Sequence, residues 1–164
     1  MTEDIVLQTH KFLLKHKITI AVAESCSGGI LSSLLTRTSG SSTYFILGLV
    51  TYSNRAKESL LAIPSSLIKQ KGVVSEEIAR KMASRVRTLA NADLGIGITG
   101  IAGPTGGNKD KPVGTVFIAV ANKKMILSKK YSFRGERKAI RNKAAIASLG
   151  LLQALFKNAR IHSH

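Results

Sequence analysis

The stretch Ile18-Thr19-Ile20-Ala21-Val22-Ala23-Glu24-Ser25-Cys26-Ser27-Gly28-Gly29 decides the fold class of this chain. Its first half is short and rich in branched apolar residues, which predicts a buried parallel strand rather than a helix. Its second half is a turn of small residues, and the apolar-periodic segment from Ile30 to Leu35 predicts a helix after it. We therefore expect Ser25 where a strand ends and a helix begins, which is where open α/β sheets place ligands.

The turn residues Ser27, Gly28 and Gly29 are candidates for substrate binding. Glycine lets backbone N–H groups approach a ligand closely, and a helix N-terminus favours a phosphate or an oxyanion. A serine-capped helix with glycines in its turn would have the same sequence without any ligand. The turn alone leaves both interpretations open.

A second expected strand-to-helix turn carries a lysine. Phe45 to Tyr52 predicts another buried strand, and Asn54 is expected to cap the helix that contains Lys57. A serine hydroxyl needs a base to remove its proton, and none of the four histidines flanks either turn. A lysine can be that base when burial and nearby positive charge lower its pKa. Ser25 and Lys57 therefore predict a serine/lysine hydrolase, although the spacing also fits a solvated helix lysine.

A third candidate segment follows the strand expected from Leu94 to Thr99. The loop from Gly100 to Gly114 is rich in glycine and proline, so it can fold closely around a ligand and offer N–H groups to an oxyanion or a phosphate. A connection that is merely rich in turn residues would look the same, and no Gly-Lys-Ser/Thr closes a P-loop. The candidate binding residues of this segment are Thr99, Gly100, Gly103, Thr105 and Gly106.

Two arginines lie at the start of the last expected helix, about Lys138 to Phe156. Arg137 and Arg141 are four residues apart, so they share a helix face and could together hold a phosphate. The alternative is that Arg137 and Arg141 are two ordinary surface arginines of a basic protein and bind no phosphate.

Five ordered sequence blocks, covering nearly the whole chain, carry a family resemblance. They are Glu24 to Gly29, Val50 to Asn54 with Ala56-Lys57, Gly72 to Glu77, Thr99 to Gly107, and Lys111 to Thr115. Together they resemble the CinA C-terminal domain family. That family includes the bacterial nicotinamide mononucleotide deamidase of pyridine nucleotide salvage and NAD metabolism. This enzyme hydrolyses the carboxamide of the nucleotide to give nicotinate mononucleotide and ammonia.

The resemblance implies roles for individual residues. Ser25 would be the nucleophile and Lys57 its base, while Tyr52 matches a tyrosine that could relay a proton or orient the lysine. Ser53 and Asn54, in the same block, are expected to contact substrate, and both Arg137 and Arg141 match arginines in family members. The implied partner is a phosphorylated pyridine nucleotide, with no metal and no cofactor. Because the family often self-associates, we expect a homo-oligomer, with a homodimer as the default.

The sequence departs from the family pattern in two places. Arg55 stands where many relatives carry glutamate, and Asn108-Lys109-Asp110 replaces a more acidic stretch. Arg55 lies beside the expected dyad, where it could lower the pKa of Lys57 or shift the choice of phosphorylated amide. The N-terminal molybdopterin-binding-like domain of the larger family protein is absent, so we interpret the chain as the stand-alone form.

The lone cysteine, Cys26, excludes an internal disulfide and fits a reducing compartment. It lies beside Ser25 and is therefore a rival nucleophile. That role would need an activating group of its own, so we interpret Cys26 as a small buried filler.

Composition and charge limit the classes of protein to which the chain can belong. The 164 residues, 44% of them hydrophobic, predict one domain over 1–164, with a tail that frays from about residue 158. The chain shows no signal peptide and no membrane-length apolar run, so we expect a cytoplasmic location and no membrane partner.

A net charge of +16 favours anionic partners. The basic residues are spread out and aromatics are few, so nucleic acid is a possible but unsupported partner. The alternative function is a non-catalytic, basic nucleotide- or DNA-binding module linked to competence.

The remaining elements complete the expected fold. The pattern predicts a first helix over about 3–16, a helix capped by Ser75 with an apolar stripe that ends at Leu89, and a hairpin around Asn122-Lys123. Alternating helices and strands predict a three-layer α/β/α sandwich, and the final hairpin makes its sheet mixed, though mostly parallel.

Overall fold

The computed structural model describes the backbone of residues 2–161 and the side chains of residues 5–157. Its central sheet has the strand order β2-β1-β3-β4-β5. The strands are β1 (Ile20–Glu24), β2 (Phe45–Val50), β3 (Leu94–Gly100), β4 (Thr115–Ala121) and β5 (Ile126–Ser132). The helices are α1 (Thr2–His16), α2 (Ile30–Thr36), α3 (Asn54–Leu61), α4 (Ser65–Lys71), α5 (Glu76–Leu89) and α6 (Arg137–Ile161), with a short 3₁₀ helix, η1 (Ser41–Thr43).

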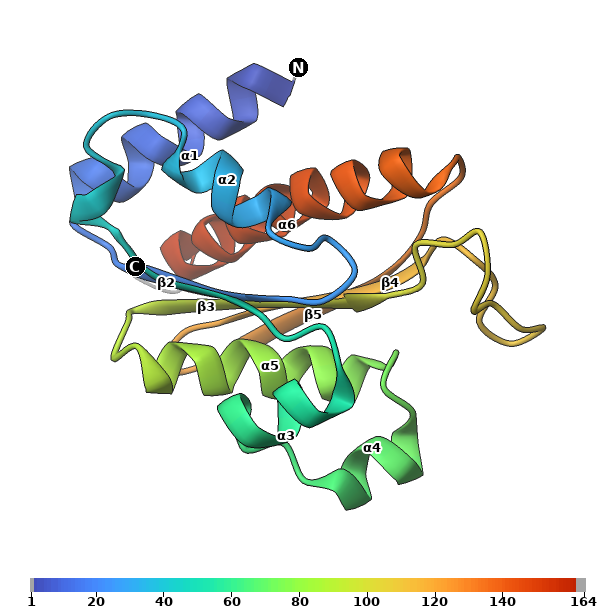
Figure 1. Ribbon diagram of the computed structural model, residues 1–164. Helices are drawn as coiled ribbons and strands as arrows, with labels where there is room; N and C mark the ends of the chain where they lie inside the picture. The colour runs from blue at the N-terminus through green and yellow to red at the C-terminus, as the bar shows by residue number, and fades with distance from the viewer. Residues whose placement is uncertain (1, 162–164) are drawn as a thin grey trace.

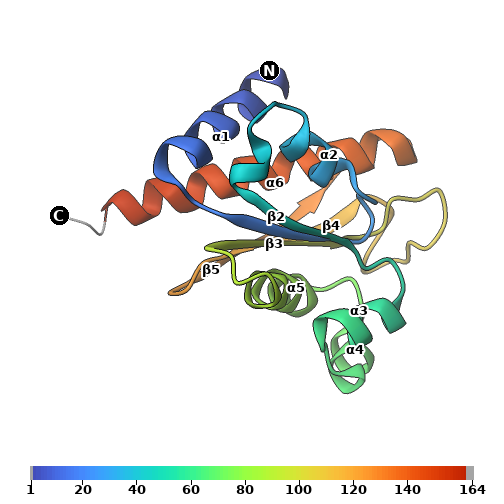
Figure 2. The same cartoon turned by 60° about the vertical axis from the view of Figure 1, so that its left-hand side comes forward.

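The helices form two layers, one on each face of the sheet (Figures 1 and 2). Helices α1, α2 and α6 cover one face, and α3, α4 and α5 lie on the other. Strand β1 pairs in parallel with both β2 and β3, whereas β4 runs antiparallel to both β3 and β5. The predicted α/β/α sandwich with a mixed sheet is therefore confirmed, and β4 alone runs against the other strands.

The parallel part of the sheet brings the candidate segments together. In the register of β1, Glu24 lies between Val50 of β2 and Ile98 of β3. The backbone N–H of Ser25 donates to the carbonyl of Ile98 at 3.0 Å, and that of Thr51 donates to the carbonyl of Glu24 at 2.8 Å. The loops that follow these three strands consequently start at the carboxyl ends of the strands, on one side of the sheet. Open α/β folds bind ligands there.

Strand β2 differs from the sequence expectation. It was expected to be buried, but it is an edge strand with alternating exposure, and Ile46 and Val50 are 46% and 49% exposed. An edge strand has a neighbour on one side only, so part of its apolar surface remains in solvent.

Smaller differences lie at helix ends. Ser53, rather than Asn54, caps α3, because its hydroxyl accepts from the N–H of Ala56 at 3.0 Å. Ser75 caps α5 as predicted, but Leu89, the last residue of that helix, is 58% exposed and lies outside the buried stripe. Helix α6 continues to Ile161, past the point where fraying was expected, and residues 162–164 lie outside the described part of the chain.

Glycines in β3 allow α5 to pack closely on the sheet. A Cβ atom at Gly97 would collide with the carbonyl of Ala79 and lie 2.6 Å from the backbone nitrogen of Ala83. We expect Gly97→Ala to destabilise the protein by about 1–3 kcal/mol through overpacking. Gly150→Ala is the matched control, since a Cβ atom at this glycine of α6 would meet no other part of the protein within 4 Å and alanine favours the helix by about 1 kcal/mol. Relative to the wild-type chain, the urea concentration at the unfolding midpoint should fall for Gly97→Ala and rise for Gly150→Ala. An unchanged midpoint in Gly97→Ala would contradict this close packing.

Candidate active site

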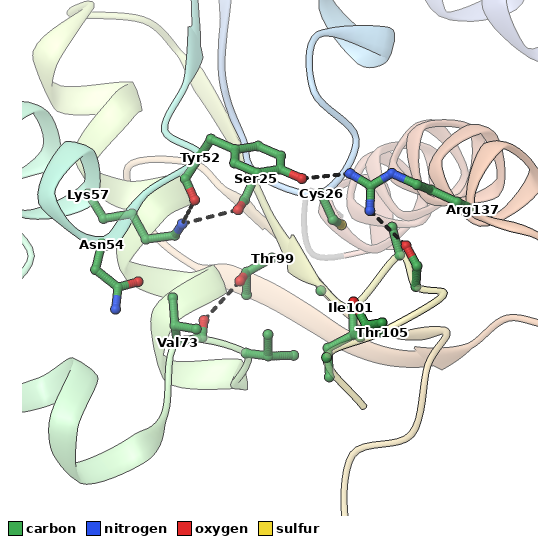
Figure 3. Close-up of a pocket in the computed structure, with 15 residues that line it drawn as sticks. Ser25, Cys26, Tyr52, Asn54, Lys57, Val73, Thr99, Ile101, Thr105 and Arg137 are labelled. Atoms are coloured by element: carbon green, nitrogen blue, oxygen red, sulfur yellow. Dashed lines mark hydrogen bonds between the residues drawn. The ribbon is translucent and has the colours of Figure 1, made fainter. Parts of the chain in front are cut away.

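Ser25 and Lys57 meet at the carboxyl ends of β1 and β2. Ser25 follows β1 directly, and Lys57 lies one turn into α3. The Nζ atom of Lys57 lies 3.0 Å from the Oγ atom of Ser25, and the two residues are 1% and 8% exposed, respectively. Figure 3 shows the lysine side chain pointing toward the serine. The sequence-predicted pair is therefore in hydrogen-bond contact.

The other contacts of Lys57 determine which way that hydrogen bond can run. Nζ also donates to the carbonyl of Thr51 at 2.7 Å and to the carbonyl of Tyr52 at 3.4 Å. Among the described residues, no Asp or Glu side chain forms an ion pair with it. A neutral amine has two N–H bonds and one lone pair. If the two carbonyls take the two N–H bonds, the lone pair is left for the hydroxyl proton of Ser25.

Burial favours this neutral form. It lowers the pKa of Lys57 from the ordinary 10.5 to about 8, and the opposing effect of Cys26 is smaller. Arg55, which was expected to contribute to this shift, is exposed to solvent and is not among its causes. Removal of the ammonium from water, rather than a neighbouring positive charge, therefore prepares the lysine to accept a proton.

Glu24 holds the turn that presents Ser25, and the sequence analysis missed this residue. Its side chain is fully buried, at 0% exposure, and its two oxygens accept five hydrogen bonds. The donors are the N–H groups of Gly29, Leu31 and Ser32 and the hydroxyls of Ser27 and Ser32, at 2.6–3.1 Å. The signal in the sequence was an acidic residue between an apolar strand and the start of a helix, where a carboxylate can satisfy unpaired N–H groups.

Cys26 has the environment of a structural residue. It is 4% exposed, and burial raises the pKa of its thiol from 9.0 to about 11, despite the lowering effect of the Cys26 and Ser27 backbone amides. A thiol with so high a pKa is almost entirely protonated at neutral pH, and the thiolate is the nucleophilic form.

A cavity of about 240 Å³ opens beside the Ser25–Lys57 pair. Most of the sequence candidates line it. All of them except Arg137, the first residue of α6, come from the carboxyl end of β3 or from the segments that follow β1, β2 and β3. These residues are Ser25, Tyr52, Asn54, Lys57, Thr99, Gly100, Gly103, Thr105, Gly106 and Arg137, together with Cys26, Val73, Val74, Ile101 and Ala102. Thr99 also donates from its hydroxyl to the carbonyl of Val73 at 2.8 Å, which joins two walls of the cavity.

Five of the candidates lie outside this lining: Ser27, Gly28, Gly29, Ser53 and Arg141. The Ser27 hydroxyl donates to Glu24 at 2.6 Å, and the Ser53 hydroxyl caps α3. Gly28 and Gly29 have φ angles of 58° and 96°, which shape the turn. Arg141 packs against Gly28 and donates to the carbonyl of Ser27 at 3.2 Å. In the structure, Ser27, Gly28, Gly29 and Arg141 therefore shape or support the turn after β1, and Ser53 caps α3.

Tyr52 and Arg137 form the rim of the cavity (Figure 3). Tyr52 is 57% exposed, and its hydroxyl accepts a hydrogen bond from Arg137 at 2.7 Å. Arg137 also donates to the carbonyl of Gly103 at 2.7 Å. Tyr52 therefore contacts Lys57 through its backbone carbonyl, while its hydroxyl faces the arginine.

Arg137 also lines a second cavity, of about 580 Å³, together with Arg141 and Lys138.

No group of three or more His, Cys, Asp or Glu side chains suited to a metal ion occurs within the part of the chain that the structure describes. None of the helices over residues 2–161 combines the length and the hydropathy needed to span a bilayer.

Comparison with known proteins places this chain in a family. The family model described as the CinA C-terminal domain matches residues 2–156. The chain belongs to the CinA C-terminal domain family. A CinA-like protein of Geobacter sulfurreducens is 50% identical over 136 residues, which are 83% of this chain and 33% of that relative. A CinA-like protein of Syntrophus aciditrophicus is 49% identical over 142 residues, or 86% of this chain and 34% of the relative. The chain thus spans about a third of the length of these curated CinA relatives.

Solved structures of two competence- or damage-inducible proteins have a similar fold. The competence/damage inducible protein CihA of Agrobacterium tumefaciens matches with a TM-score of 0.91 at 31% identity, covering 94% of each chain. The competence damage-inducible protein A of Klebsiella pneumoniae matches with a TM-score of 0.91 at 28% identity, covering 99% of each chain.

Proposed function

We propose that this CinA-domain chain is an amidohydrolase that removes the carboxamide nitrogen of nicotinamide mononucleotide, with Ser25 as the nucleophile and Lys57 as its base. The observation that carries the proposal is the buried 3.0 Å contact between the Lys57 amine and the Ser25 hydroxyl. The family resemblance supplies the substrate, and the chemistry of the pair supports amide hydrolysis.

The reaction would begin with transfer of the Ser25 proton to the neutral Lys57 amine as Oγ attacks the amide carbon. Backbone N–H groups of the loop from Gly100 to Gly106, which lines the same cavity, would hold the oxyanion. The Lys57 ammonium would then protonate the leaving nitrogen, so that ammonia departs and an ester forms on Ser25. Water, deprotonated by Lys57, would cleave this ester to the nicotinate carboxylate and the free hydroxyl.

The rim of the cavity suits the rest of the substrate. The exposed ring of Tyr52 offers an aromatic face to the positively charged pyridinium, an interaction worth about 0.5–2 kcal/mol. The phosphate would lie toward the second cavity, where the three positive charges of Arg137, Lys138 and Arg141 exceed the one negative charge of Glu136. The proposed pose therefore extends from the dyad to the start of α6.

Ammonia release from nicotinamide mononucleotide tests the proposal. The wild-type chain should release ammonia and nicotinate mononucleotide in equal amounts, and Ser25→Ala should not. Cys26→Ala is the matched neighbour, and it should keep most of the activity because the buried thiol with a pKa near 11 is not the nucleophile. Loss of turnover in Cys26→Ala with full turnover in Ser25→Ala would assign the reaction to the thiol instead.

The pH dependence follows from the lowered pKa of Lys57. Because the base must be neutral, kcat/KM should rise about tenfold per pH unit below a pKa near 8 and level off above it. Arg55→Ala should leave this inflection in place, since burial causes the shift. A rate that is flat between pH 6 and 9, or that falls with rising pH, would contradict a neutral lysine base.

The net charge of +16 favours a second candidate, the non-catalytic nucleotide- or DNA-binding module. Salt-dependent binding of DNA without deamidase activity would favour that function. Activity on a different phosphorylated amide would keep the Ser25–Lys57 chemistry and change the substrate.

A further inference from the structure

One wall of the candidate active-site cavity is a long loop that the sheet holds at its base. This loop, residues 101–114, joins β3 to β4 and extends beyond the end of the sheet (Figure 1). The N–H of Gly114 donates to the carbonyl of Ile101 at 2.8 Å, and the N–H of Ile101 donates to the carbonyl of Thr115 at 2.9 Å. The first half of the loop lines the cavity, so its position there depends on contacts beyond this base.

Another wall of the cavity is the connection between α4 and α5, where Val73 and Val74 line it. The Thr99 hydroxyl, near the end of β3, donates to the carbonyl of Val73 at 2.8 Å (Figure 3). Further along the loop, Nζ of Lys111 donates to the carbonyl of Val74 at 2.6 Å. It also donates to the carbonyl of Lys71, the last residue of α4, at 3.4 Å. These two contacts, the Lys111 bridge, tie the loop to the other wall.

The chemistry of the Lys111 bridge makes it a strong tie. A hydrogen bond from an ammonium is stronger than one between neutral groups. The last carbonyls of a helix have no partner within the helix, and a lysine side chain can satisfy them. Lys111 is half-buried, and a Cβ atom at Gly72 would lie 3.3 Å from its Nζ. The glycine at the end of α4 therefore leaves room for the ammonium.

A tight turn fixes the backbone before this lysine. The N–H groups of Asp110 and Lys111 donate to the side-chain oxygen of Asn108, at 3.0 and 2.7 Å. The N–H of Asn108 donates to the carbonyl of Lys111 at 3.0 Å. Asparagine forms such side-chain to backbone bonds in turns. Asn108-Lys109-Asp110 is where the sequence departs from the family pattern, and in this chain it builds the turn that presents Lys111.

We propose that Lys111 is a positioning residue for the amide reaction, because its bridge to Val74 holds the loop whose N–H groups face the oxyanion. Lys111 does not line the cavity, so it acts through the loop and touches no substrate. The inference rests on the proposed function, in which the N–H groups from Gly100 to Gly106 stabilise the oxyanion. Such donors must be fixed in advance, and a displacement of about 1 Å is enough to slow catalysis about 10²-fold.

Steady-state ammonia release from nicotinamide mononucleotide tests the role in the reaction. Lys111→Met should lower kcat about 10- to 100-fold and change KM less than about threefold, because the lost positioning acts mainly in the transition state. Lys111→Arg keeps N–H donors for the same carbonyls and should restore most of kcat. Lys109→Met, at the exposed lysine of the same turn, is the matched control and should behave as the wild-type chain. An unchanged kcat in Lys111→Met, or a rise in KM alone, would overturn the proposal.

Hydrogen exchange tests the bridge without any substrate. Peptides over residues 101–114 should exchange about tenfold faster in Lys111→Met than in the wild-type chain or Lys109→Met, because a charged hydrogen bond no longer opposes local opening. Peptides of β1 should not change, which shows that the variant is folded. Unchanged exchange of the loop would overturn the proposal. A wild-type chain that releases no ammonia, together with faster loop exchange in Lys111→Met, would contradict the proposed function and support the role of Lys111 in holding the loop.

Discussion

Lys57→Met should lower kcat for ammonia release about 10²- to 10⁴-fold, the usual contribution of a positioned general base. Methionine fills much of the space of the buried lysine side chain but has no lone pair that can take the Ser25 proton. The 3.0 Å contact and the pKa near 8 make Lys57 the base closest to that hydroxyl among the described contacts. The measurement is steady-state release of ammonia at pH 8.5, with nicotinamide mononucleotide in excess.

Two controls separate a catalytic effect from a structural one. Lys69→Met removes an exposed lysine from α4 and should leave kcat unchanged. The double variant Ser25→Ala/Lys57→Met should be no slower than the slower of the two single variants, because residues that act as one unit have non-additive effects. Multiplied losses in the double variant, or full activity in Lys57→Met, would contradict the proposed dyad.

The proximity of Ser25 and Lys57 was predictable because it follows from local patterns and sheet topology. The branched strand, the small-residue turn and the next apolar strand each have a clear local sequence pattern. Parallel neighbouring strands have their carboxyl ends on the same side of the sheet, so residues that follow β1 and β2 meet there. The contact between two residues 32 positions apart therefore needed only correct strand assignments.

Other features depended on neighbours that the sequence does not specify. A uniformly apolar strand such as Phe45 to Val50 looks the same at the centre or the edge of a sheet, and strand order decides its burial. Likewise, Tyr52 offers both a carbonyl and a hydroxyl, and only the structure shows that the carbonyl faces Lys57.

The role of Glu24 gives the second large expected effect. Glu24→Gln should destabilise the protein by about 3 kcal/mol or more, because hydrogen bonds to a charged acceptor contribute about 1.5–3 kcal/mol each and buried donors without a partner add a penalty. A glutamine amide nitrogen cannot accept a hydrogen bond. One oxygen of Glu24 accepts from the N–H groups of Gly29 and Leu31, and the other accepts from that of Ser32. Whichever way the amide is oriented, at least one of these fixed N–H donors faces an NH₂ group.

Urea unfolding of Glu24→Gln against Glu58→Gln measures this effect. Glu58 is exposed on α3, so its replacement should change stability by no more than about 0.5 kcal/mol, as is usual for surface sites. An equal, small effect in both variants would contradict the structural role of the five hydrogen bonds. Because Ser25 directly follows Glu24, the folded fraction of Glu24→Gln should also show a lower kcat. A hydroxyl held 3.0 Å from its base depends on a rigid turn, and displacing it by about 1 Å is enough to slow catalysis about 10²-fold.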